Sequence, residues 1–166
     1  MSRFGECDDW DNETILAAGR WTARINAVLR GKPAQPFFRE LEAALLAMSD
    51  KRLIEGALVR DGQVCALGQL LAHRKEQSGM SRKQALAAIE REFPWGDSEL
   101  DIATDAARIT GMSVTFGELI QWMNDEDAGS GLTPERRWQA MLDWTQAQIR
   151  PLAAAMHGFQ PERRED

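Results

Sequence analysis

The chain has 166 residues, of which 43% are apolar and 28% charged, and its net charge is −6; these values are ordinary for one globular domain. No apolar run reaches the roughly 18 residues that a membrane-spanning helix needs, and the first residues lack the apolar core of a signal peptide. We therefore expect a single domain over 1–166 in the cytoplasm, without a membrane partner and with residues 1–11 and 159–166 loosely ordered.

The first part of the chain predicts two helices and one short segment of a different kind. Apolar side chains recur at helical spacing over 15–29 and again over 37–48. Near 57–65 the pair Asp61-Gly62 supplies the positive φ angles that a two-residue hairpin turn needs. This segment is either a small β-hairpin or a plain loop between helices, and the sequence leaves both open.

The rest of the chain predicts five more helices, because start and stop signals recur along it. Ser81 and Thr115 each begin a capping-box pattern, Thr133 precedes a proline at a first helical position, and Gly111 is a left-handed stop. The expected helices are 66–77, 82–92, 98–110, 115–124 and one from 134 that continues past Pro151 with a kink. The predicted fold is mainly α, a compact bundle of about six to seven helices with at most one small hairpin.

Motifs of catalytic and metal sites are absent from the sequence. It has no Gly-x-Ser-x-Gly, no P-loop and no dinucleotide-binding glycine motif. His73 and His157 have no neighbouring ligand residue, and the loop after Asn124 places Ala128 where an EF-hand needs a calcium ligand. We therefore predict no catalytic residue, no cofactor and no metal. The 26 acidic residues leave a carboxylate-based enzyme as an alternative.

Acidic residues are concentrated between Phe93 and Glu135, where nine carboxylates and the single cation Arg108 give a net charge of −8. A concentrated negative surface steers association with a basic partner. We therefore predict that a protein partner contacts eight of these acids: Asp97, Glu99, Asp101, Asp105, Glu118, Asp125, Glu126 and Asp127. Whether they share one face depends on how the helices pack.

Residues 100–123 also have the pattern of a helix-turn-helix, with the turn at Gly111. No Lys or Arg occurs from 109 to 135, however, and DNA binding draws most of its affinity from cations that displace counterions. We therefore expect no direct contact with nucleic acid. Trp122 follows Leu119 by three positions and Phe116 by six, and is expected in the core.

The basic residues of 74–91 form one cluster. Such a cluster is expected to be a solvated helix face, or to pair with the acidic residues of 93–135 within the fold. Contact with a phosphate or an acidic partner is the alternative. The cations are Arg74, Lys75, Arg82, Lys83 and Arg91.

Five local patterns lie between residues 36 and 149. They are Phe38-Arg39-Glu40-Leu41 with Ala44-Leu45, Lys51-Arg52-Leu53-Ile54, Gly62-Gln63-Val64-Cys65-Ala66-Leu67-Gly68, Asn124-Asp125-Glu126, and Thr133-Pro134-Glu135-Arg136-Arg137-Trp138. Together they resemble a group of uncharacterised proteins encoded by bacteriophages and prophages of Gram-negative bacteria. The resemblance implies an accessory gene of a mobile element in a bacterial host cell. It implies no activity and no functional residue.

These observations together favour a non-enzymatic phage accessory protein that acts by binding another protein. The expected partner is a host protein with a basic nucleic-acid-binding surface, and the expected role is inhibition of a defence complex, as anti-CRISPR proteins do. The alternatives are a phage regulatory or morphogenetic factor that binds DNA or other phage proteins, and a carboxylate-based enzyme. The oligomeric state does not follow from the sequence.

Overall fold

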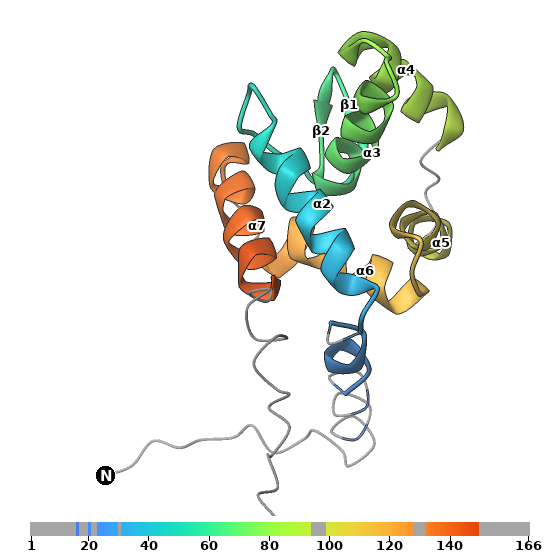
Figure 1. The fold of residues 1–166 in the computed structure, drawn as a ribbon, viewed down its shortest axis with the longest axis vertical. Helices are drawn as coiled ribbons and strands as arrows, with labels where there is room; N and C mark the ends of the chain where they lie inside the picture. The colour runs from blue at the N-terminus through green and yellow to red at the C-terminus, as the bar shows by residue number, and fades with distance from the viewer. Residues whose placement is uncertain are drawn as a thin grey trace, which may run out of the picture.

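The fold is seen in a computed structural model, which describes residues 16, 20, 23–29, 31–93, 99–127 and 132–149, without the side chains of 99–103, 126 and 127 (Figure 1). In chain order its elements are α2 (Ala34–Leu46), β1 (Val59–Arg60), β2 (Gln63–Val64), α3 (Ala66–Gln77), α4 (Arg82–Glu92), α5 (Glu99–Thr110), α6 (Val114–Trp122), the π-helical turn η1 (Met123–Asp127) and α7 (Pro134–Gln148). The predicted fold class, a helical bundle with a small hairpin, is confirmed.

The first expected helix is described only in part. Residues 23–29 are helical, and Ile25, Val28 and Leu29 pack against the hydrophobic core. The loosely ordered ends expected at 1–11 and 159–166, and the kink expected at Pro151, lie outside the described residues.

The segment near 57–65 is a β-hairpin rather than a loop. Val59 pairs with Val64 and Arg60 with Gln63 in an antiparallel register. Asp61 has φ +52° and Gly62 φ +76°, the two positive angles of a tight hairpin turn whose twist matches that of its strands. The Asp-Gly pair therefore does what the sequence suggested.

Most helix ends follow their local signals. The Ser81 capping box is present at α4, Thr133 caps α7 by accepting from the backbone N–H of Arg136, and Gly111 ends α5 with φ +67°. The start predicted at Thr115 is wrong, because the Oγ of Ser113 accepts from the N–H of Phe116 at 3.3 Å and begins α6 two residues earlier.

The core lies where α2 contacts both α3 and α7, with α5 packed on α6 (Figure 1). Phe38 is fully buried, and its ring meets those of Phe37, Phe116 and Trp144 edge to face, with centroids 5.4 to 5.7 Å apart. This is the arrangement that aromatic quadrupoles favour. The aromatic contacts therefore join α2, α6 and α7 into one apolar cluster.

Candidate protein-binding surface

The predicted contact acids lie on two packed helices and the turn that follows them. Helix α5 carries Glu99, Asp101 and Asp105, α6 carries Glu118, and η1 carries Asp125, Glu126 and Asp127. Because α5 packs directly against α6, the fold brings these two groups of acids to neighbouring elements. Asp97 lies outside the described residues, and only the side chains of Asp105, Glu118 and Asp125 are described among the eight.

Arg108, the single cation of the acidic segment, offsets part of its charge. Its guanidinium lies 3.5 Å from the carboxylate of Asp105 and 3.8 Å from that of Glu92 on α4. It also stacks over the ring of Phe93 at 4.4 Å. Asp105 is thus engaged within the protein.

Asp125 is half-buried and makes internal hydrogen bonds. Its Oδ1 accepts from the backbone N–H of Gly56 at 3.3 Å and from the side-chain amide of Asn124 at 2.7 Å. Burial, the largest effect, raises the pKa of this carboxyl, while the bonds from Asn124 and Gly56 oppose the rise. The geometry gives Asp125 a structural role, to which any contact with a partner would be an addition.

Asn124 joins three distant segments, a role that sequence reasoning missed. It is 2% exposed; its Oδ1 accepts from the N–H of Ala66 at 3.0 Å, and its Nδ2 donates to the carbonyl of Ile54 at 2.9 Å. The amide therefore ties η1 to the start of α3 and to the segment before the hairpin. The only signal for it was the Asn-Asp-Glu pattern, because a buried Asn cannot be told from a turn residue by spacing.

The outer face of α6 is exposed and carries large side chains. Val114 is 43% exposed, Trp122 is 40% exposed, and Glu118 between them is exposed too. Successive residues four apart lie within a narrow arc of a helix, so these three side chains share one side of α6. We call Val114, Glu118 and Trp122 the α6 face.

The prediction that Trp122 belongs to the core is therefore wrong. The inner side of α6 is formed by Phe116, Leu119 and Ile120, which follow the three-and-four spacing of a buried stripe, and the buried Met123 at the start of η1 continues it. A residue six positions after Phe116 lies roughly 120° around the helix from it, at 3.6 residues per turn. Repeated steps of three had carried Trp122 off the buried side.

The helix end predicted near Asn124 lies close to the observed end of α6 at Trp122. The chain continues through the π-helical turn Met123–Asp127 before the described residues stop. A π turn inserts one extra residue relative to an α-helix and changes which side chains face inward. Here both Met123 and Asn124 are buried, which a regular helix end would not require.

The basic cluster pairs with acids other than the predicted contact acids. Arg74 makes a two-bonded pair with Glu40 at 2.6 and 2.7 Å, and its third bond goes to the carbonyl of Ile109 at 2.7 Å. Lys75 pairs with Glu92 at 2.8 Å. These cations therefore stabilise contacts among α2, α3, α4 and α5 rather than neutralising the α6 face.

No protein-family model, curated protein or solved structure matches the chain.

Among the residues that the structure describes, no three His, Cys, Asp or Glu side chains lie together in an arrangement that could hold a metal ion. Cys65 is a free thiol that accepts from the N–H of Gly68 and caps α3, and burial raises its pKa to about 12. His73 lies 3.0 Å from the amide of Gln77.

Among the described helices, none has the length and apolar character needed to cross a membrane.

Proposed function

We propose that this chain is a non-enzymatic accessory protein of a phage or another mobile element that acts by binding a host protein. In its sharpest form, the proposal is an inhibitor of a nucleic-acid-handling defence complex, of the anti-CRISPR type. The observation that supports it is the α6 face, where an exposed Trp122 accompanies Glu118. Trp is enriched among the residues that dominate binding energy at interfaces, and Trp122 is 40% exposed.

The charge around the α6 face defines the chemistry of the partner. The sequence has no Lys or Arg between Arg108 and Arg136, and the described part of this segment ends in three consecutive acidic positions on η1. A surface of this sign attracts basic grooves that otherwise hold nucleic acid, and it accelerates their association at low ionic strength. A basic partner with an apolar pocket for Trp122 fits these features.

The test is affinity capture from a bacterial lysate at low and moderate salt, followed by mass spectrometry and a binding assay with the purified partner. We expect a basic, nucleic-acid-binding protein whose affinity falls at least about tenfold with Trp122→Ala and with Glu118→Lys. Leu46→Ala on α2 and Glu90→Lys on α4 are the matched controls, because they change a similarly exposed apolar residue and an exposed acidic residue away from α6.

A competition experiment with nucleic acid decides whether the protein occupies the partner's nucleic-acid-binding groove. A nucleic acid that occupies the partner's groove should displace the protein, since both need the same basic surface. Simultaneous binding of the protein and the nucleic acid would contradict the inhibitor mechanism. Equal affinity of the α6 variants and their controls would remove the α6 face from the interface.

A second candidate is a phage regulatory factor that binds DNA, which the arrangement of α5 and α6 favours. The two helices are joined by the short Gly111 turn and approach so closely that a Cβ on Gly117 would lie 2.7 Å from the backbone nitrogen of Ala107. A helix-turn-helix has this tight crossing. The exposed Glu118 on the second helix opposes it, since this helix would face phosphates.

Fluorescence anisotropy with labelled duplex DNA separates the two candidates. The inhibitor proposal predicts no binding at low salt. Binding with a steep dependence on salt concentration would support the regulatory factor and contradict the acidic mimic.

A further inference from the structure

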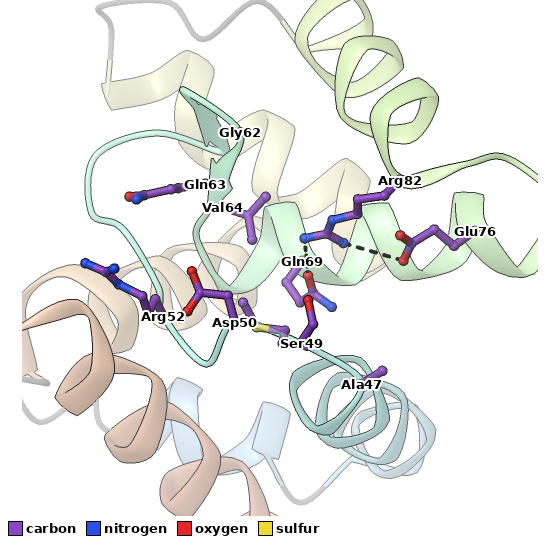
Figure 2. Close-up of a pocket in the computed structure, with 11 residues that line it drawn as sticks. Ala47, Ser49, Asp50, Arg52, Gly62, Gln63, Val64, Gln69, Glu76 and Arg82 are labelled. Carbon is purple, nitrogen blue, oxygen red and sulfur yellow. Dashed lines mark hydrogen bonds and ion pairs between the residues drawn. The ribbon is translucent and has the colours of Figure 1, made fainter.

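A pocket of about 340 Å³ opens between the end of α2, the hairpin, α3 and the first residue of α4 (Figure 2). Its volume is at the lower end of the range of small-molecule sites, roughly 300–1,000 Å³. No residue of α6 lines it, so it is independent of the α6 face. The lining residues that carry the argument are Met48, Ser49, Asp50, Val64, Gln69 and Arg82.

One wall of the pocket carries the guanidinium of Arg82, which is held in place by a buried side chain. The Nη2 of Arg82 donates to the Oε1 of Gln69 at 2.8 Å, and the Nε2 of Gln69 donates to the carbonyl of Ala44 at 2.6 Å. Gln69 is 1% exposed, so a buried amide that cannot move positions the charged group. Such a relay orients Arg82 toward the pocket before any ligand arrives.

Arg82 keeps hydrogen-bonding capacity for a ligand. Its other side-chain partner among the described residues is Glu76, at 3.5 Å, which is long for a charge-assisted bond. A guanidinium has five N–H donors, and these two contacts use only two of them. Three N–H donors are left for a ligand, and two neighbouring N–H groups of a guanidinium can bind a carboxylate through two parallel bonds.

A carboxylate without a partner stands across the pocket. Asp50, on the loop after α2, is exposed at the rim and makes no side-chain hydrogen bond or ion pair with any other residue that the structure describes; Figure 2 places it on the opposite side of the pocket from Arg82. Arg52, which also lines the pocket, is paired with Glu135 at 3.1 Å. Met48 and Val64, which are both buried, also line the pocket and supply its apolar surface.

We propose that this pocket binds a small zwitterion, a free amino acid or a dipeptide, with its carboxylate on Arg82 and its ammonium on Asp50. A simple anion would face Asp50 and Glu76, and a simple cation would face Arg82, so a molecule that carries both charges is favoured. Ser49 also lines the pocket, and its hydroxyl can donate or accept a hydrogen bond.

The experiment is an NMR titration of the ¹⁵N-labelled full chain with glycine, L-serine, L-leucine, L-glutamine and glycylglycine, one at a time. We expect saturable shifts of the amide signals of Ser49, Gln63 and Val64. The methyl ester and the N-acetyl derivative of the tightest ligand each lack one charge and should bind at least about tenfold more weakly. Tighter binding of glycylglycine than of the amino acids would show that the pocket favours a longer distance between the ammonium and the carboxylate of its ligand.

Variants test the two anchors separately. Asp50→Asn should weaken binding at least about tenfold, and Arg82→Lys should do the same because it retains the charge and loses the fork. Arg91→Lys on α4 and Asp61→Asn in the hairpin lie outside the pocket lining and should bind as the unchanged chain does. The dispersion of the same spectra shows whether each variant is folded.

Three results would overturn the proposal. These are the absence of saturable shifts with all five zwitterions, equal binding of the singly charged derivatives, and unchanged affinity of a folded Asp50→Asn or Arg82→Lys variant. Trp122→Ala should leave this binding intact, so a failure here is distinct from a failure of the proposed partner interaction.

Discussion

At the scale of single residues, Gly68 is the position where the fold leaves no room for a side chain. A Cβ built there would lie 2.0 Å from the carbonyl oxygen of Leu58, an atom of the backbone that cannot rotate away. Gly68 belongs to α3 and Leu58 to the segment just before β1, so their contact presses the first turn of α3 against the hairpin. The glycine is therefore required by packing and not by its own dihedral angles.

We predict that Gly68→Ala lowers the free energy of unfolding by about 3 kcal/mol, because α3 and the hairpin must move apart. Urea denaturation at neutral pH measures the change. Gly62→Ala is the matched control: its Cβ would meet no atom within 4 Å, and only the positive φ of +76° opposes it, at about 1 kcal/mol. A Gly68→Ala variant as stable as the Gly62→Ala variant would show that the close approach is relaxed in solution.

At the scale of elements, the π turn η1 is held to the rest of the fold by side-chain amides and carboxylates rather than by apolar packing alone. Asn124 reaches the N–H of Ala66 and the carbonyl of Ile54, and Asp125 reaches the N–H of Gly56. These backbone groups belong to segments with no regular partner at that point. The η1 turn thus provides hydrogen-bond partners for backbone groups at the start of α3 and in the segment before the hairpin.

We predict that Asn124→Ala destabilises the protein by about 3 kcal/mol, because two buried backbone groups lose their partners. Thermal and urea unfolding both measure this loss. Gln121→Ala, which removes an amide from α6 nearby, should change stability by less than about 0.5 kcal/mol. If the two variants were equally stable, water would have to replace the Asn124 amide.

A second joint between elements is the pair of Arg74 and Glu40, which connects α3 to α2 and, through the carbonyl of Ile109, to the end of α5. The hydrogen bond from Arg74 is the main reason that the pKa of Glu40 is lowered, and burial opposes it. Both side chains are about one-third exposed, at 35% and 34%, so water screens the pair. The ion pair between Arg74 and Glu40 therefore contributes only moderately to the stability of the fold.

We predict that Glu40→Gln destabilises the protein by about 1 kcal/mol at neutral pH. Because the folded pKa of Glu40 lies below 4.5, its contribution is present above pH 4.5 and is lost as pH falls through the lowered pKa. The difference between the unchanged chain and the variant should therefore shrink in acid. Urea denaturation over a pH series measures it, and a gap that stays constant down to the acid limit would rule out the ionised pair as its origin.

At the scale of the whole molecule, the segment between α2 and α3 ties together parts that are far apart in sequence. The N–H of Leu53 donates to the carbonyl of Pro134 in α7 at 3.0 Å, and the N–H of Ile54 donates to the carbonyl of Val64 at 3.0 Å. Leu53 is fully buried in the same core as the helices. Opening this segment would therefore require the core to separate.

We predict that the amide hydrogens of Leu53 and Ile54 exchange with solvent only by global unfolding, so that their exchange free energies equal the unfolding free energy from urea. Native-state hydrogen exchange measures both. The N–H of Arg52, which donates to the nearby carbonyl of Asp50 at 2.9 Å, should exchange much faster through local opening. Equal, fast exchange of all three amides would place this segment outside the cooperative core.

The sequence predicted the helices well because their ends depend on groups a few residues away. Ser81 with Gln84 specifies the start of α4, and Asp61-Gly62 specifies the hairpin turn, whatever the rest of the chain does. The start of α6 was misplaced because Ser113 and Thr115 both offer a hydroxyl cap. Only packing of the following turn decides between two such neighbouring caps.

Of the candidate site, only the net charge could be predicted from the sequence. The absence of cations after Arg108 follows from the residues alone, because formal charge does not depend on folding. The exposure of Trp122, the burial of Asn124 and the pocket between Asp50 and Arg82 were decided by tertiary structure. Each depends on which side of a helix meets a segment distant in sequence, and local spacing does not contain that information.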